Sequence, residues 1–166
     1  AALSHRAEHD ALTGLPNRNR LFSRLDVAVA AAAAHQQPVA VGFLDIDDMK
    51  RVNDTLGHAA GDELLVAVAH RLKASVRSAD TVARLGGDEF VVVLNGVGHA
   101  ANGEAVMQAL HGALTMPYHV AGASVRIGVS AGLAFCPEHG VTPAQLLARA
   151  DRAMYGFEAL TLVPFD

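Results

Sequence analysis

Two acidic groups, each next to a largely apolar segment, could bind a metal ion. The first is Gly86-Gly87-Asp88-Glu89, which lies between apolar runs at residues 81–85 and 90–94. This pattern predicts a β-hairpin with its carboxylates at the turn. Glycine permits a positive φ and a close approach by a ligand, and carboxylate oxygens are ligands for Mg²⁺. The turn is therefore a candidate metal site, with a solvated hairpin turn as the alternative.

The second acidic group ends the run at residues 39–47, which is nearly continuous in apolar side chains and predicts a strand buried on both faces. Side chains alternate along a strand, so Asp45 and Asp47 share one face. A carboxylate at the end of a buried strand must be hydrogen-bonded, paired or bound to metal. We favour metal over simple capping here.

The segment after this strand could bind a nucleotide. Residues 48–54 predict a short helix whose first backbone N–H groups are free, with Lys50 beside them as a point charge, and this arrangement suits phosphate. Asn53 and Asp62 lie on either side of a break at Gly57. An amide and a carboxylate together match the donors and acceptor of a guanine edge. Asx residues beside glycine also commonly act as helix caps, and that alternative stays open.

Arg77 and Asp80 immediately precede the predicted hairpin. Arginine can grip phosphate or a guanine edge with two hydrogen bonds. The alternative is a local ion pair that contributes little to stability.

Four helices are expected around these segments, because apolar residues recur at spacings of three and four. They cover residues 16 to about 35, 60 to about 76, 100–115 and about 142–155, and strands are expected within 120–135. Pro16 suits the first position of the first helix.

Composition limits the classes of function. With 166 residues and 51% hydrophobic content, the chain forms one domain with a proper core. The net charge of −4 argues against binding to a nucleic acid polymer or a membrane surface. The single Cys136 fits a reducing compartment, and we expect a cytoplasmic domain without a signal or membrane-spanning segment. The scattered histidines argue against a zinc site.

Together these residues resemble the GGDEF family, diguanylate cyclases that condense two GTP into cyclic di-GMP. The resemblance covers nearly the whole chain and rests on ordered motifs at residues 10–18, 45–54, 57–62, 86–90 and 150–155. It implies an α+β fold (α/β in the broad sense) with a central, mostly antiparallel five-stranded sheet flanked by helices, similar to nucleotidyl cyclases and the polymerase palm. We expect residues 1–9 to be a linker or helix from an upstream domain and 10–166 to be the GGDEF domain.

The resemblance also implies the catalytic roles. Asp45, the backbone carbonyl of Ile46 and Asp88 would hold two Mg²⁺ or Mn²⁺ ions. Asp88 or Glu89 would assist deprotonation of the attacking 3′-hydroxyl, and the sequence leaves the choice between them open. The metals would neutralise the triphosphate.

Further residues would bind the substrate by the same resemblance. Guanine would be read by Asn53 and Asp62 in a pocket lined by Leu12 and Leu65. The β- and γ-phosphates would contact Lys50 and the backbone of Asp48 and Met49.

The family's reaction joins two GTP molecules, so the resemblance implies a homodimer with facing sites, arranged by an upstream sensory domain. The full protein could be anchored to a membrane through such a domain. Arg77 and Asp80 match the family's Arg-x-x-Asp inhibitory site, which implies that the product cyclic di-GMP binds there and restrains the enzyme.

The sequence departs from the family near its C-terminus, where Glu158 and Leu162 stand in place of the usual Lys and Arg. An acid near a triphosphate could weaken binding or rate by on the order of a few kcal/mol. The main hypothesis is an active, product-inhibited cyclase. The alternatives are a weak or inactive module that binds GTP or cyclic di-GMP and regulates a neighbouring domain, and a purely structural dimerisation module.

Overall fold

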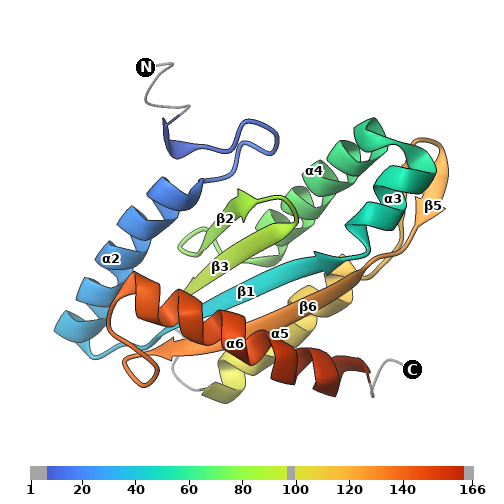
Figure 1. Ribbon diagram of the computed structural model, residues 1–166. Coiled ribbons are helices and arrows are strands. Elements are labelled where there is room, and N and C mark those ends of the chain that lie inside the picture. The colour runs from blue at the N-terminus through green and yellow to red at the C-terminus, as the bar shows by residue number, and fades with distance from the viewer. Residues whose placement is uncertain (1–6, 97–99, 163–166) are drawn as a thin grey trace.

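The computed structural model describes residues 7–96 and 100–162, without the side chains of 100–101 and 155–162. Helices and strands are interspersed along the chain (Figure 1). Their order is α2 (Arg18–His35), β1 (Val39–Asp47), α3 (Met49–Leu56), α4 (His58–Ser75), β2 (Thr81–Gly86), β3 (Glu89–Asn95), α5 (Ala100–Leu114), β4 (Tyr118–Val120), β5 (Ala123–Val125), β6 (Gly128–Cys136) and α6 (Pro143–Leu162).

The central sheet has the strand order β2-β3-β1-β6, and every neighbouring pair is antiparallel. The expected α+β class is confirmed, but the sheet has four strands, so the prediction of five was wrong. Residues 120–135 were expected to supply strands to it. Instead, positive φ at Ala121 and Gly122 turns the chain back, and β4 and β5 pair only with each other. Only β6 joins β1.

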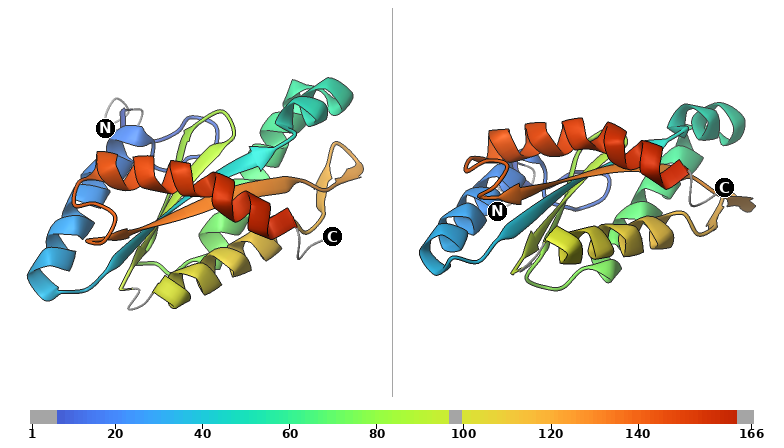
Figure 2. Two further views of the ribbon diagram at one scale, coloured as in Figure 1. Left: turned by 60° about the horizontal axis from the view of Figure 1, so that its bottom comes forward. Right: turned by 90° about the horizontal axis from the view of Figure 1, so that it is seen from below.

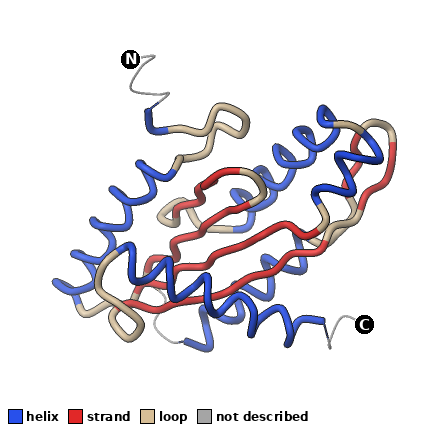
Figure 3. Tube along the Cα trace, viewed as in Figure 1, coloured by secondary structure: helices blue, strands red, loops and turns tan. Residues whose placement is uncertain are grey.

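The sheet lies between two layers of helices (Figures 1 and 2). One hydrophobic cluster joins α2 and α6 to the face that carries Val41 and Phe43. A second cluster joins α3, α4 and α5 to the opposite face, which carries Leu44 and Ile46. Strand β1 is therefore buried on both faces as predicted, and the tube view shows the central sheet in the middle of the molecule, with the β4–β5 hairpin at its periphery (Figure 3).

The ends of two helices differ from expectation. Helix α2 begins at Arg18 because the side chain of Asn17 accepts a hydrogen bond from the backbone N–H of Arg20 (3.1 Å), which is N-cap geometry. Pro16 therefore precedes the cap and is not the first helical residue. Helix α6 continues to Leu162 rather than ending near Tyr155.

Helix α6 lies very close to β6. A Cβ at Gly132 would overlap the backbone of α6 and lie 2.8 Å from the Cα of Met154. Glycine at this position therefore sets how closely the helix can approach the sheet. Among the described helices, none is long and apolar enough to cross a membrane.

Candidate active site at the end of the central strand

The acidic hairpin forms as predicted and lies against the end of β1. Gly86 and Gly87 both have positive φ (146° and 49°), a conformation that glycine adopts without strain. The backbone N–H of Ile46 donates to the carbonyl of Asp88 (3.0 Å). Asp45 and Asp88 are 43 residues apart in the sequence. This contact brings the two acidic groups together at one end of the central strands.

Several carboxylates lie close together at this end of the strands. Asp45 lies directly opposite Glu89 in the β1–β3 ladder, and its Oδ1 is buried with no hydrogen-bond partner. Burial, the negative charge of Asp88 and a side-chain hydrogen bond with Asp88, together with the charges of Glu89 and Asp47, raise the pKa of Asp45 to about 7. A buried carboxylate oxygen without a partner is destabilising unless a proton or cation satisfies it.

These oxygen ligands therefore suit a divalent cation whose remaining ligands come from a bound substrate. Among the described residues, no cluster of three or more His, Cys, Asp or Glu side chains is arranged to hold a metal. Mg²⁺ is commonly held by one or two carboxylates together with substrate phosphates and water. Two carboxylates and the backbone carbonyl of Ile46 suit such a site.

Asp47 has a different role from its neighbour Asp45. Its Oδ1 accepts a hydrogen bond from the hydroxyl of Ser130 on β6 (2.9 Å). Asp47 therefore ties the end of β1 to the adjacent strand. For this carboxylate, the hydrogen-bonded alternative weighed above is the one observed.

The segment after β1 places backbone donors beside the carboxylates. Asp48 adopts a left-handed conformation (φ 64°, ψ 25°) and makes no side-chain cap to α3. Such a conformation is strained for a residue other than glycine. Met49 and Lys50 follow as the first two residues of α3, and the N–H groups at a helix start have no acceptor within the helix. The Lys50 side chain is exposed, so this corner offers donors and a cation to an anion.

Asn53 and Asp62 come from different helices that meet at Gly57 (φ 96°). Asn53 is half-buried on α3 and Asp62 is exposed on α4. The amide of Asn53 lies against Gly61, the residue next to Asp62. The Asn53 amide thus lies against the first turn of the helix that carries Asp62.

Leu12 and Leu65, the residues predicted to line the base pocket, share one hydrophobic cluster. Leu65 is a buried member of this cluster, and Leu12 is partly buried and packs against the cluster. The cluster includes α3 and α4, so both leucines lie on the side of the sheet that carries Asn53.

Sequence reasoning missed a contact that holds the hairpin. Arg84 donates from Nη1 to both carboxylate oxygens of Asp10 (3.0 and 3.1 Å) and from Nη2 to the carbonyl of Gly87 (2.7 Å). Burial alone would raise the pKa of Asp10, but hydrogen bonds from Thr13 and Arg84 lower it below its ordinary value. The N-terminal loop is thus linked to the turn of the hairpin through one arginine. No local spacing indicates this contact, because Asp10 and Arg84 are 74 residues apart.

Arg77 and Asp80 lie together at the other end of the hairpin, beside the start of β2. The Asp80 side chain is only 3% exposed, whereas that of Arg77 is 63% exposed. Asp80 accepts from the backbone N–H groups of Arg77 and Asn95 (both 3.0 Å) and pairs with the Arg77 guanidinium at 3.4 Å. Asp80 thus organises the loop, and the Arg77 guanidinium is held in the same loop because it also donates to the carbonyl of Asn95, although most of its side chain is exposed.

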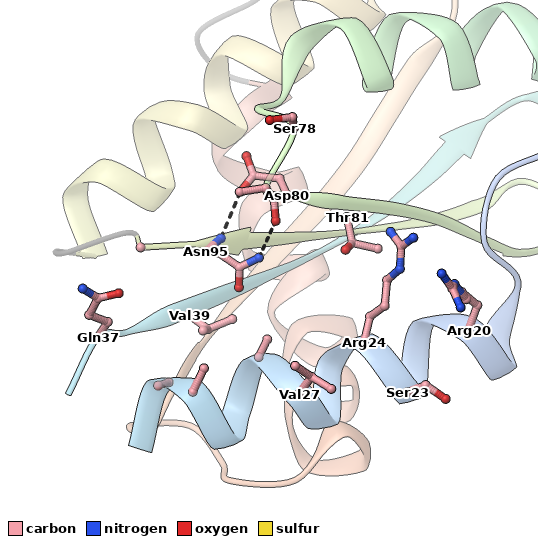
Figure 4. A pocket seen from close by; sticks show the side chains of 15 residues that line it. Arg20, Ser23, Arg24, Val27, Gln37, Val39, Ser78, Asp80, Thr81 and Asn95 are labelled. Carbon is pink, nitrogen blue, oxygen red and sulfur yellow. Dashed lines mark hydrogen bonds between the residues drawn. The ribbon is translucent and has the colours of Figure 1, made fainter. Parts of the chain in front are cut away.

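A groove of about 720 Å³ lies between this loop and α2 (Figure 4). Arg20 and Arg24 line it from α2, and Asp80 and Asn95 line it from the sheet side. In Figure 4 the Arg24 side chain extends from the helix toward Thr81. The groove is separate from the carboxylates at the opposite end of the hairpin.

Glu158 and Leu162, the departures from the family pattern, both lie on α6. Their side chains fall outside the described part of the structure. Their predicted effect on phosphate binding therefore stays a prediction.

Comparisons with known proteins agree with this geometry. The family model described as "Diguanylate cyclase, GGDEF domain" matches residues 7–159. The diguanylate cyclase TpbB of Pseudomonas aeruginosa (strain UCBPP-PA14) is 44% identical over 156 residues, which cover 93% of this chain and 36% of TpbB. The chain thus spans about a third of that relative's length.

Solved structures are similar as well. A truncated form of TpbB from Pseudomonas aeruginosa, comprising only the GGDEF domain, is 42% identical with a TM-score of 0.87, covering 92% of this chain and 89% of that one. The coiled coil and GGDEF domain of DgcB from Caulobacter crescentus, solved with c-di-GMP, is 27% identical with a TM-score of 0.82, covering 93% and 82%. The hairpin, the strand end and these matches together assign the chain to the family of GGDEF domains.

Proposed function

We propose that this domain condenses two GTP molecules to cyclic di-GMP and two pyrophosphates, with one GTP bound by each protomer of a homodimer. The observation that carries the proposal is the buried, unpartnered Oδ1 of Asp45 beside the hairpin turn. In each half-reaction the 3′-oxygen of one GTP bonds to the α-phosphorus of the other, loses its proton, and pyrophosphate leaves.

Asp45, the carbonyl of Ile46 and Asp88 are the residues that would hold two divalent ions, Mg²⁺ or Mn²⁺. Bound there, the ions would neutralise the triphosphate and lower the pKa of the attacking hydroxyl. Asp88 or Glu89 would accept the proton of that hydroxyl. The raised pKa of Asp45 supports the proposal, because a site built for cations gathers carboxylates that repel one another without them.

The remaining site residues would position GTP. The first N–H groups of α3 and Lys50 would bind the β- and γ-phosphates, since a helix N-terminus and a cation both favour anions. Asn53 and Asp62 would read the guanine edge above the pocket lined by Leu12 and Leu65.

The test is incubation of the concentrated protein with GTP and Mg²⁺, with detection of cyclic di-GMP by mass. We expect product from the unmodified chain and none from Asp88→Ala. Asp26→Ala, at an exposed position of α2, is the matched control and should keep full activity. Unchanged turnover by Asp88→Ala would refute the metal assignment.

A second function is favoured by Glu158 and Leu162, which stand where the family usually has cations. In this alternative the domain is weak or inactive, and it binds GTP or cyclic di-GMP to regulate a neighbouring domain. Silence from the unmodified chain, with activity restored by Glu158→Lys and Leu162→Arg together, would identify a domain that has lost the family's activity through these two residues. Ready turnover of the unmodified chain would exclude it.

We also propose product inhibition at Arg77 and Asp80, supported by the exposed side chain of Arg77. Because Asp80 is engaged within its own loop, Arg77 would make the first contact with the phosphates of cyclic di-GMP. Arg77→Ala should raise the concentration of cyclic di-GMP required for inhibition without changing the initial rate. An unchanged inhibition curve would contradict this role.

The larger context is likewise a proposal. Residues 1–9 would connect the domain at 10–166 to an upstream sensory domain that sets the dimer, in a protein acting in the cytoplasm. The length of TpbB, of which this chain covers 36%, supports such an arrangement.

A further inference from the structure

We propose that Gly61 is a positioning residue for base selection: its missing side chain lets the Asn53 amide lie against α4, beside Asp62, in the orientation that selects guanine. The inference rests on the proposed function, because it concerns the same nucleotide site. It adds Gly61 to the residues of the site, because the absence of a side chain there leaves room for the Asn53 amide.

The junction of α3 and α4 places these residues face to face. Helix α3 ends at Gly57, whose N–H donates to the carbonyl of Asn53 (2.9 Å). Helix α4 begins at once, and the N–H of Gly61 donates back to the carbonyl of Gly57 (3.1 Å). No intervening loop separates the helices, so the Asn53 side chain meets the first turn of α4.

The volume of a side chain at position 61 is already occupied by Asn53. A Cβ on Gly61 would overlap the amide oxygen Oδ1 of Asn53 and lie 3.0 Å from its Cγ. The next nearest atom, Cε of Met49, would be 3.5 Å away, an ordinary contact. The Asn53 amide is therefore the one group within reach that excludes alanine.

Glycine inside a helix lowers stability relative to alanine. Gly61 is buried in α4 and has no positive φ that would require glycine. The backbone thus gives no reason for glycine at this position. The position of the Asn53 amide is the reason that glycine is needed there.

The response to a Cβ at position 61 follows from which atoms overlap. The overlapped atoms are the tip of a flexible side chain, so Asn53 can rotate to another rotamer while both helices stay in place. The amide would then leave its place beside Asp62, and one of the two groups proposed to read guanine would be lost. Asp62 itself would be unaffected.

The experiment measures binding of 3′-deoxy-GTP and 3′-deoxy-ATP with Mg²⁺ by titration calorimetry, because these analogues lack the hydroxyl that reacts. We expect Gly61→Ala to bind 3′-deoxy-GTP about tenfold more weakly, the effect of losing about one hydrogen bond. Binding of 3′-deoxy-ATP should change little, so the preference for guanine falls. The matched control is Gly112→Ala, a helical glycine whose Cβ would meet nothing within 4 Å, and it should keep the wild-type preference.

A double-mutant cycle separates this role from a structural one. Gly61→Ala should have no further effect on binding in a protein that already carries Asn53→Ala, because the overlapped atoms are gone. The double variant also keeps the test decisive if Gly61→Ala alone unfolds. An unchanged preference for guanine in Gly61→Ala, or an equal loss in both backgrounds, would overturn the inference. Failure of the unmodified protein to prefer 3′-deoxy-GTP would instead refute the proposed function.

Discussion

Replacing Asp45 with Asn should make the metal-free protein more stable at alkaline pH while abolishing its activity. Burial and the charges of Asp88, Glu89 and Asp47 raise the pKa of Asp45 from 3.8 to about 7. The folded protein therefore keeps this proton to a higher pH than the unfolded chain does. Its free energy of unfolding falls as the pH rises from 3.8 through about 7.

The magnitude follows from the shift. At about 1.4 kcal/mol per pKa unit, a shift of about three units corresponds to at most about 4 kcal/mol. Asp45 is half-buried, so solvent reduces the cost of its charge. We therefore expect its ionisation to lower the free energy of unfolding by about 1–2 kcal/mol. Asparagine has the same shape without the charge. Above the pKa of Asp45, the variant should therefore melt about 2–8 °C higher than wild type.

The assay is calorimetric unfolding in EDTA at pH values below and above the pKa of Asp45, repeated with millimolar Mg²⁺. The advantage of Asp45→Asn should vanish at acidic pH, where the wild-type carboxyl is protonated. Mg²⁺ should raise the melting temperature of wild type at alkaline pH and leave the variant unchanged. Asp26→Asn, on an exposed face of α2, is the control and should behave as wild type throughout. A variant that is less stable than wild type in EDTA at alkaline pH would refute the reasoning.

Three further substitutions test the contacts that hold the site and the fold. Arg84→Lys loses the two-oxygen contact with Asp10, so we expect about 1–3 kcal/mol less stability in urea unfolding. Its turnover should fall more than its affinity for GTP, and unchanged kinetics would show that the hairpin holds its position without this arginine. Gly132→Ala would press a Cβ on the backbone of α6, and thermal unfolding should show a loss of about 1–3 kcal/mol. Arg71→Met removes donors to backbone carbonyls and a cation 3.6 Å from the ring centre of Tyr118. It should lower stability by about 1–3 kcal/mol with little effect on nucleotide binding.

The sequence was most informative where one local rule applied. The hairpin was predicted from Gly86-Gly87 between two apolar runs, since glycine alone adopts both turn conformations freely. The run Val39–Asp47 was predicted as a buried strand because it lacks polar alternation, and it is the central strand. Helix α2 was predicted to within two residues at its start, where the cap at Asn17 was missed.

The errors came where long-range pairing competes with local pattern. The segment 120–135 has strand character throughout, but whether a strand joins the central sheet depends on which edge is free to receive it. Here β4 and β5 pair with each other, and β6 alone reaches β1. The periodicity of the segment does not indicate which of its strands will pair with the central sheet.

The sequence by itself determined the chemical groups of the site and their order, because residue type and spacing reveal carboxylates at a turn and at a strand end. Only the tertiary structure decided what those groups do to one another. It placed Glu89 opposite Asp45, tied the hairpin to Asp10 through Arg84, and laid Asn53 in the space left at Gly61. Each of these contacts depends on the register and packing of segments that are distant in the sequence. Charge repulsion, ion pairing and steric overlap depend on distances in space, and spacing along the chain does not specify those distances.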